Sequence, residues 1–262
     1  MRNGWVGGLV RIVGALTAIL ASGTAARADF KIRSPDVNVG EWAIETVGSA
    51  GFDSDPARNG ERSATFEVQW GVTPWWQTEL ELLWERQPGP GMGTRFTQIT
   101  TENIFVLTES GDAWADIGLF AEYGQTLLRG HPNETTLGPL LRKAFWGLTN
   151  TVNLLVEKDL GRFSSGSPRF LWAWETRVDA WQVSFGEHFS VEPGVQYYSE
   201  PGTVGELGRW KQQDNRIGPQ LFGELSRIGA GALEWNAGFL VGLSRAQPRF
   251  TPRWQIEYDL HF

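Results

Sequence analysis

The chain has 262 residues, a formal net charge of −7 and no cysteine. Its acidic balance argues against a nucleic-acid partner, because a phosphate backbone attracts the opposite charge. Without cysteine the chain has neither disulfides nor a lipidated cysteine. Yet 14 Trp, 15 Phe and 32 Gly are an unusual content for an acidic water-soluble protein. After the first 28 residues, no segment approaches the roughly 18 consecutive apolar residues that a membrane-spanning helix needs.

Residues 1–28 have the layout of a secretory signal peptide. Basic residues accompany an apolar run from Ile12 to Leu20, and Ala26-Arg27-Ala28 matches a small-residue cleavage site. The apolar run is too short for a permanent membrane helix. We therefore expect a mature chain that begins at Asp29. Residues 1–28 hold three of the 23 basic residues and none of the 30 acidic ones, so the mature chain has a formal charge of −10.

The rest of the chain predicts one all-β domain. We expect residues 29–36 to be a periplasmic N-terminal segment and residues 37–262 to form a single 12-stranded antiparallel transmembrane β-barrel, with both termini in the periplasm. Short amphipathic strands, many aromatic residues and the lack of a long apolar run all fit this architecture. The expected strands are 37–48, 63–72, 76–85, 96–107, 115–123, 136–146, 152–157, 170–178, 189–197, 216–225, 233–243 and 253–262.

Strict alternation of apolar and polar side chains is the strongest evidence for these strands. In 63–72, Ala64, Phe66 and Val68 alternate with polar residues such as Glu67, and 76–85 and 253–262 repeat the pattern. The register of 96–107 is ambiguous; we favour Ile99, Thr101, Phe105 and Leu107 outward, which also exposes Asn103. Strand 136–146 is ambiguous too. Proline cannot donate to a strand ladder, and Pro139, Pro193 and Pro219 lie inside expected strands.

The lengths of the connections support an even number of strands. From a periplasmic start, odd-to-even connections should be long outer loops, and the others should be short inner turns. The odd-to-even connections are 49–61, 86–95, 124–135, 158–168, 199–214 and 244–251, and most are rich in Gly and Pro. The shorter ones are 73–75, 108–113, 147–150 and 226–231. Only 179–187 is longer than the rule predicts.

Aromatic residues gather at the ends of the expected strands. Trp and Tyr prefer the lipid headgroup layer, where an amphipathic ring is half hydrated. We therefore predict a membrane girdle of Trp70, Trp76, Trp84, Trp114, Tyr123, Trp172, Tyr197, Trp235 and Trp254. Aromatic residues that fill the core of a soluble barrel are the alternative. In such a barrel the apolar face would turn inward and the carboxylates outward.

The last ten residues resemble the closing strand of Gram-negative outer-membrane β-barrels. Trp254, Ile256, Tyr258, Leu260 and Phe262 alternate with charged or polar residues, and the chain ends on an aromatic residue. The resemblance implies an outer-membrane location, contact with outer-membrane lipid and lipopolysaccharide, and recognition by the barrel-assembly machinery through Phe262.

A second, narrower resemblance comes from the strand–turn–strand sequences. Gly71-Val-Thr-Pro-Trp-Trp-Gln-Thr-Glu-Leu-Glu-Leu82 is similar to a pattern of the outer-membrane transporters named for the meta pathway of phenol degradation. Gly138-Pro-Leu-Leu-Arg-Lys143 and Val152-Asn-Leu-Leu-Val-Glu157 are similar in style. These are turn and strand motifs, so they imply a fold and a location more than a substrate.

The inward faces of the expected strands are rich in carboxylates. A twelve-stranded barrel lies between small barrels filled by side chains and wide porins, so its lumen should be narrow and wet or closed by long side chains. Excess carboxylate would favour cations or polar neutral solutes. The candidate lumen residues are Glu41, Glu45, Glu67, Glu79, Glu81, Glu122, Arg142, Glu157, Glu175, Arg177, Arg216, Glu224, Glu234, Arg253 and Glu257.

Three functions remain open at this stage. The first is a passive channel for small polar or cationic solutes, and the second is a non-conducting barrel whose inner Glu–Arg network only holds the wall together. The third is a lipid-modifying enzyme at the rim, for which the three histidines His131, His188 and His261 are poorly placed. His131 and Glu134 alone make a weak metal site. We therefore expect no catalytic site, metal or cofactor.

Overall fold

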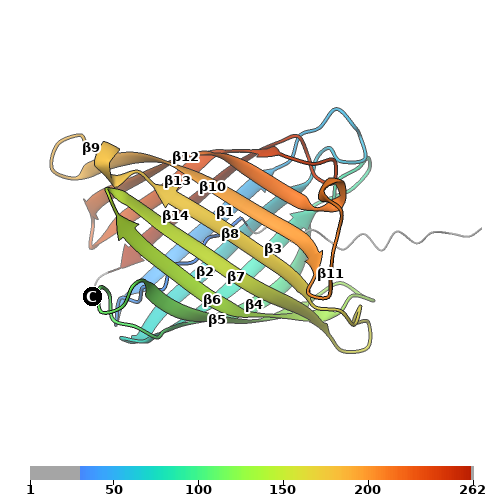
Figure 1. Ribbon diagram of the computed structural model, residues 1–262, viewed down its shortest axis with the longest axis horizontal. Helices are drawn as coiled ribbons and strands as arrows, with labels where there is room; N and C mark the ends of the chain where they lie inside the picture. The colour runs from blue at the N-terminus through green and yellow to red at the C-terminus, as the bar shows by residue number, and fades with distance from the viewer. Residues whose placement is uncertain (1–29, 261–262) are drawn as a thin grey trace, which may run out of the picture.

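The computed structural model describes residues 30–260. Twelve long strands, each antiparallel to its neighbours, form one closed barrel (Figure 1). They are β1 (Trp42–Ala50), β2 (Arg62–Thr73), β3 (Trp76–Arg86), β4 (Arg95–Val106), β5 (Asp116–Thr126), β6 (Asn133–Phe145), β7 (Leu148–Leu160), β8 (Arg169–Arg177), β10 (Phe189–Thr203), β12 (Asp214–Ile228), β13 (Gly231–Gly242) and β14 (Phe250–Leu260). Pairing of β1 with β14, from Trp42 opposite Leu260 to Ser49 opposite Arg253, closes the barrel. The predicted fold class is confirmed.

Four short elements lie in two of the connections. The turn η1 (Asp179–Trp181) and strand β9 (Val183–Ser184) precede β10, and strand β11 (Glu206–Leu207) and the turn η2 (Trp210–Gln212) follow it. Within residues 30–260, no helix has the length and apolar character to cross a membrane. The predicted signal peptide 1–28 and the terminal Phe262 lie outside the described residues.

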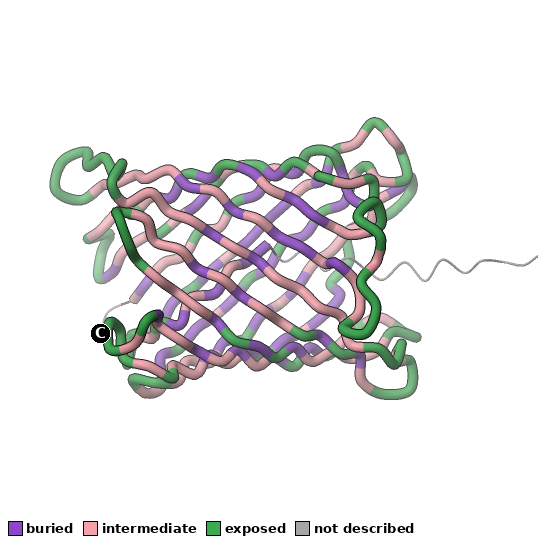
Figure 2. Tube along the Cα trace, in the orientation of Figure 1, coloured by how far each residue is buried: buried purple, intermediate pink, exposed green. Residues whose placement is uncertain are grey.

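The side chains alternate along the strands as the sequence predicted, with the polar face inside. Glu67 and Glu79 are buried, whereas the outward-facing Phe66, Leu80 and Trp254 are exposed. The alternation of buried and more exposed positions is visible along the strands in Figure 2. A barrel of a water-soluble protein would have the opposite arrangement, because burying apolar side chains stabilises it. The exterior of this barrel is therefore suited to a lipid environment.

Strand β4 has the register that we favoured. Glu102 is buried inside the barrel, and the neighbouring Asn103 lies on the outward face with Ile99 and Phe105. The Nε1–H group of Trp76 donates a hydrogen bond of 3.0 Å to the side-chain oxygen of Asn103. Asn103 is thus accommodated on an apolar face because an interfacial tryptophan satisfies its carbonyl.

The three prolines that we expected inside strands all lie on the outward face, and two of them follow a glycine. Pro139 and Pro219 are exposed, and the preceding Gly138 and Gly218 come close to the backbone of the next strand. A Cβ on Gly218 would lie 1.7 Å from the carbonyl oxygen of Phe239. These Gly-Pro pairs therefore fit the wall through a close backbone approach that only glycine permits.

The first residue of β1 and the last residue of β14 lie at the same end of the cylinder, which we call the terminal end (Figure 1). We call the opposite end the loop end. The loop end carries the connections 51–61, 87–94, 127–132, 161–168, 204–213 and 243–249. The terminal end carries 74–75, 107–115, 146–147, 178–188 and 229–230. Connection 178–188, which contains η1 and β9, remains an exception to the predicted alternation of long and short connections, and 107–115 is a second one, since it is longer than the loop-end connections 127–132 and 243–249.

Candidate functional site

The interior of the barrel contains a segment that belongs to no strand. Residues 30–36, which we call the strap, run through the lumen, and residues 37–41 lead from the strap to β1. Phe30, Lys31 and Arg33 are buried against the inner wall. The prediction of a periplasmic segment at 29–36 is therefore wrong for its described part, because the strap's cations and apolar groups find complementary partners on the wall.

Lys31 binds three carboxylates from three neighbouring strands. Its ammonium lies 2.8 Å from Glu45 of β1 and 2.8 Å from Glu79 of β3, and it also pairs with Glu67 of β2. All four side chains are buried. Because these strands are adjacent and the three residues lie on the same inward face, their carboxylates converge on one point.

Arg33 is held in two ways: its guanidinium forms an ion pair, and its backbone is hydrogen-bonded to a side chain of the wall. Its guanidinium donates two hydrogen bonds to Glu102 of β4, of 2.7 and 2.6 Å, and stacks over the ring of Phe120 at 4.4 Å. The side chain of Asn153 accepts a bond from the Arg33 backbone N–H at 2.8 Å and donates one to its carbonyl at 2.7 Å. A bidentate Arg–carboxylate pair fixes orientation as well as charge.

The apolar residues of the strap face the other side of the lumen. Phe30 packs in a cluster with Ala173, Tyr198 and Leu240, and Ile32 packs against the same cluster. The hydroxyl of Tyr198 donates a hydrogen bond of 2.8 Å to the carbonyl of Phe30. The order Phe-Lys-Ile-Arg is thus an extended, two-faced segment that presents its cations to β1–β4 and its apolar side chains to β8, β10 and β13.

Glycines in the wall allow the chain to pass closely where it leaves the lumen. A Cβ on Gly118 would lie 2.8 Å from Pro35, and one on Gly71 would lie 2.0 Å from the backbone oxygen of Asn38. Asp36 pairs with the predicted lumen residue Arg142 near the terminal end. At Gly71 and Gly118 the wall has no side chain, and this leaves room for the segment.

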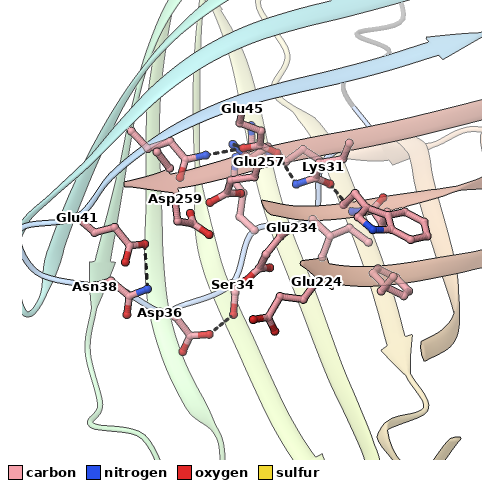
Figure 3. Close-up of a pocket in the computed structure, with 18 of the residues that line it drawn as sticks. Lys31, Ser34, Asp36, Asn38, Glu41, Glu45, Glu224, Glu234, Glu257 and Asp259 are labelled. Atoms are coloured by element: carbon pink, nitrogen blue, oxygen red, sulfur yellow. Dashed lines mark hydrogen bonds and ion pairs between the residues drawn. The ribbon is translucent and has the colours of Figure 1, made fainter. Parts of the chain in front are cut away.

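A water-accessible cavity of about 350 Å³ lies on the terminal side of the strap. Figure 3 shows the carboxylates of Glu224, Glu234, Glu257 and Asp259 around the residues that follow Lys31. Glu41 and Glu192 also line this space, and Arg177 is the cation that the wall contributes. The cavity, which we call the acidic vestibule, concentrates negative charge at the terminal end of the barrel.

A smaller cavity of about 80 Å³ lies on the other side of the strap. Apolar groups such as Phe120 and Leu171 line it together with Glu122, Glu157 and Glu200. Lys31 and Arg33 line both cavities. The strap therefore lies between the two spaces.

The other arginines that we predicted for the lumen are buried in polar networks. Arg216 lies 2.7 Å from Asp214 and 3.3 Å from Glu61, and its guanidinium covers the ring of Phe30 at 4.8 Å. Arg253 donates a hydrogen bond of 2.8 Å to Gln196. These residues lie on the loop-end side of the strap, where Arg216, Asp214 and Glu61 also line a cavity of about 200 Å³.

All predicted lumen residues face the interior, but they fall into separate groups. Glu45, Glu67 and Glu79 meet at Lys31, whereas Glu41, Glu224, Glu234 and Glu257 line the vestibule. Glu175 pairs with Arg177, Glu157 pairs with Arg169, Glu122 lines the small cavity, and Glu81 is fully buried. The partners of Arg142, Arg216 and Arg253 are given above.

Sequence reasoning missed four residues of this site: Lys31, Arg33, Glu102 and Asn153. The alternation of Phe30 to Arg33 was the available signal, since two cations and two apolar residues match a wall that is rich in carboxylates. A second signal was that the inward faces of the strands carry more carboxylates than cations, so the buried carboxylates needed positive charge from another part of the chain.

The Lys31 pocket has the donor set of a cation site. Glu45, Glu67 and Glu79 offer oxygens within 4.8 Å of one another, as do Glu134, Glu157 and Asp159 near the loop end. In both groups a basic side chain, Lys31 or Arg169, already lies among the carboxylates. The expectation of no bound metal stays a prediction.

The predicted girdle residues lie on the outer surface, where several form aromatic pairs. Trp70 stacks on Trp42 with ring centroids 5.3 Å apart, and Trp172 meets Tyr197 at 4.6 Å. Near the terminal end, Trp76 stacks with Phe105 at 6.5 Å. These paired rings lie near the ends of strands, whereas Trp254 is near the middle of β14 and Trp114 is in the connection 107–115. Contact of the girdle residues with lipid headgroups stays a prediction.

The fold and this lumen define a class: a closed antiparallel barrel with an apolar exterior and an acidic interior. No protein-family model matches the chain, and no curated protein does. The resemblance to the transporters of the phenol meta pathway therefore rests on the quoted motifs alone.

Among solved structures, the chain is similar to a bacterial polysaccharide outer membrane secretin, with a TM-score of 0.36, 9% identity, and coverage of 87% of this chain and 100% of that one. It is also similar to Pseudomonas aeruginosa OccK11 (OpdR), with a TM-score of 0.28, 9% identity, and coverage of 88% and 99%. For P. aeruginosa OccK9 (OpdG) the values are 0.27, 10%, 84% and 97%. At these scores the likenesses carry no argument about function.

Proposed function

We propose that the protein is an integral outer-membrane barrel that passes small cationic or polar solutes. Its apolar outer face, with aromatic rings at the strand ends, supports a place in a bilayer. We include in the proposal an export signal at residues 1–28 and recognition of Phe262 by the barrel-assembly machinery. The resemblance to the meta-pathway transporters agrees with a role in transport and says nothing further about the solute.

The acidic vestibule is the observation that carries the proposal. Besides Asp36 and the Lys31 partners Glu45 and Glu79, a water-accessible space of about 350 Å³ is lined by six further carboxylates, those of Glu41, Glu192, Glu224, Glu234, Glu257 and Asp259. A confined cluster of like charges raises the local concentration of counterions, because low-dielectric walls focus the field. Cations should therefore be enriched at the terminal end, and anions should be depleted there.

Reversal potentials in a planar bilayer test this selectivity. We expect wild-type protein to prefer potassium over chloride in a salt gradient, and Glu234→Gln with Glu257→Gln to reduce the preference at least twofold. Glu109→Gln, at an exposed turn of the terminal end, is the matched control and should leave it unchanged. A preference for chloride, or identical reversal potentials in all three proteins, would contradict a cation-selective vestibule.

A non-conducting barrel is the second candidate, and the filled middle of the lumen favours it. Lys31, Arg33 and their carboxylate partners cross the space between the two cavities. In that case the network would serve only to hold the wall together. Wild-type protein and a variant without the strap would then both be silent at every voltage while still showing the heat-modifiable gel mobility of a folded barrel.

We also propose that the protein is not an enzyme. His131 is exposed in the connection 127–132 at the loop end, whereas His188 precedes β10 at the terminal end. The two described histidines are therefore at opposite ends of the barrel, and a hydroxyl nucleophile would have to work with one of them alone. Unchanged outer-membrane lipid in cells that express His131→Ala or the wild type would agree with this proposal.

A further inference from the structure

We propose that the strap, residues 30–36, is a releasable blocker of the lumen, and that an extended solute with two cationic groups takes its place on the same carboxylates. The inference rests on the proposed channel function and names the class of solute that would open it. It is carried by four features of the strap: its position between the cavities, its side-chain attachment, its charge match and its exposed connection to β1.

Position makes the strap a blocker. Lys31 and Arg33 line the acidic vestibule on one side and the smaller cavity on the other. Phe30 reaches the far wall, where it packs on Ala173, Tyr198 and Leu240. Contacts with both walls mean that a solute coming from the vestibule meets the strap before it can reach the loop end.

Attachment through side chains makes the strap releasable. Residues 30–36 form no strand, so the strap is not part of the hydrogen-bonded ladder of the wall. The ion pairs of Lys31 and Arg33, the two bonds of Asn153, the Tyr198 hydroxyl and the ion pair of Asp36 with Arg142 hold it instead. The twelve strands close on one another without it, since β1 pairs directly with β14.

Charge determines what can replace the strap. If Lys31 and Arg33 left, four buried carboxylates, of Glu45, Glu67, Glu79 and Glu102, would lose their cations. Uncompensated buried charge is strongly unfavourable, so departure must be coupled to the arrival of other cations. Residues i and i+2 of an extended chain lie about 7 Å apart and point to the same face. The replacing solute is therefore an extended molecule with two amino or guanidino groups at about that spacing, such as a dibasic peptide.

The vestibule gives such a solute access to the site. Glu45 and Glu79, which hold Lys31, also line the vestibule. The connection from the strap to β1 is exposed at Asp36 and from Asn38 to Gly40. Gly40 has a φ of +81°, a conformation that glycine adopts freely. The strap can therefore swing on this turn into the vestibule without breaking a strand.

Bilayer recordings with four proteins test the proposal. We compare the wild type, a mature chain without residues 30–36, and Lys31→Gln with Arg33→Gln; Lys143→Gln with Arg227→Gln is the charge-matched control near the same end. We expect at least a fivefold higher conductance for the first two variants and no change for the control. The peptide Phe-Lys-Ile-Arg-Ser, added at the terminal side, should block the strap-less protein, and Phe-Gln-Ile-Gln-Ser should not.

The outcomes separate this inference from the proposed function. Equal conductance of the wild type and the strap-less protein would overturn the blocker while leaving the channel intact. Conductance of the strap-less protein that neither peptide blocks would overturn the dibasic site. Silence of every folded protein would refute the channel, and the inference with it.

A labelling experiment uses the full-length chain in case the strap-less variant does not fold. The protein has no cysteine, so Ile32→Cys introduces a unique thiol on the strap. We expect a water-soluble maleimide to label it slowly, and at least ten times faster when Phe-Lys-Ile-Arg-Ser is present. The same rate with that peptide, with Phe-Gln-Ile-Gln-Ser and with neither would show that dibasic solutes do not release the strap.

Discussion

The Lys31 ammonium lies 2.8 Å from the carboxylate of Glu79, and the two residues are separated by 48 positions in the sequence. Lys31 belongs to a segment without secondary structure, whereas Glu79 belongs to the wall. Their pairing couples the position of the strap to the register of β1, β2 and β3, because Glu45 and Glu67 share the same ammonium. Several carboxylates of the lumen are therefore paired with cations from a part of the chain that lies outside the barrel wall.

Replacing Lys31 by Met should destabilise the barrel. Methionine keeps much of the side-chain volume but leaves three buried carboxylates without their cation. Breaking a buried ion pair on one side costs about 3–5 kcal/mol. Urea unfolding in detergent micelles, followed by tryptophan fluorescence, should show a loss of this order.

Neutral partners should rescue that variant. Glu67→Gln and Glu79→Gln, added to Lys31→Met, remove two of the three uncompensated charges, and most of the lost stability should return. A triple variant that is less stable than Lys31→Met would show that the carboxylates do not repel one another in the absence of the ammonium.

Asn153→Ala should loosen the strap without removing any charge. The side chain makes two hydrogen bonds to the backbone of Arg33, and each is worth about 0.5–1.5 kcal/mol. We expect faster amide hydrogen exchange in residues 30–36 and unchanged exchange in β7. Asn150→Ala, on the same strand, is the control. If exchange in the strap is unaffected, the ion pairs alone hold it.

Local alternation predicted the wall because each strand records its two environments in its own residues. Phe66, Glu67 and Leu80 could be assigned to faces without knowing their neighbours. Even the ambiguous strand β4 had the favoured register, and only its partner Trp76 shows why Asn103 is tolerated outside. The number of strands followed from the turns, since a barrel with both ends on one side needs an even number.

The strap could not be predicted in the same way. Four alternating residues are too few to distinguish a strand, a loop or a plug, and the partners of Lys31 and Arg33 are 14 to 120 positions away. Only the closed barrel brings Glu45, Glu67, Glu79 and Glu102 to one side of the lumen. The vestibule likewise depends on which inward carboxylates remain after the strap has paired with the others.

Acid should detach the connection 51–61 from its neighbour 243–249. Hydrogen bonds from Arg58 hold the pKa of Asp53 below its ordinary value, and the carboxylate also accepts the backbone N–H of Arg249 at 3.1 Å. For a carboxylate with a lowered pKa, the stabilisation is present above the ordinary value and is lost as the pH falls through the lowered one.

We therefore expect the amide protection of 51–61 to fall below about pH 4, the ordinary range of an aspartate pKa. Asp53→Asn should show the weak protection already at pH 7. Asp55→Asn, which removes only the neighbouring partner of Arg58, should keep the acid dependence. Protection that is independent of pH in the wild type would show that the Phe52–Phe250 bridge alone joins the two connections.

A charge on the outer face should cost more in the middle of a strand than at its end. Leu80 is outward-facing near the middle of β3, and 49% of its surface is exposed, whereas Val72 is near the end of β2. In a bilayer, Arg at the midplane costs about 2–4 kcal/mol and near the interface about 0–1 kcal/mol. Leu80→Arg should therefore destabilise the protein in phospholipid vesicles far more than Val72→Arg. If the outer face were in water, both sites would be solvated equally and the two variants would be equally stable. That result would mean that the apolar face does not contact acyl chains, and the proposal of a membrane barrel would fail.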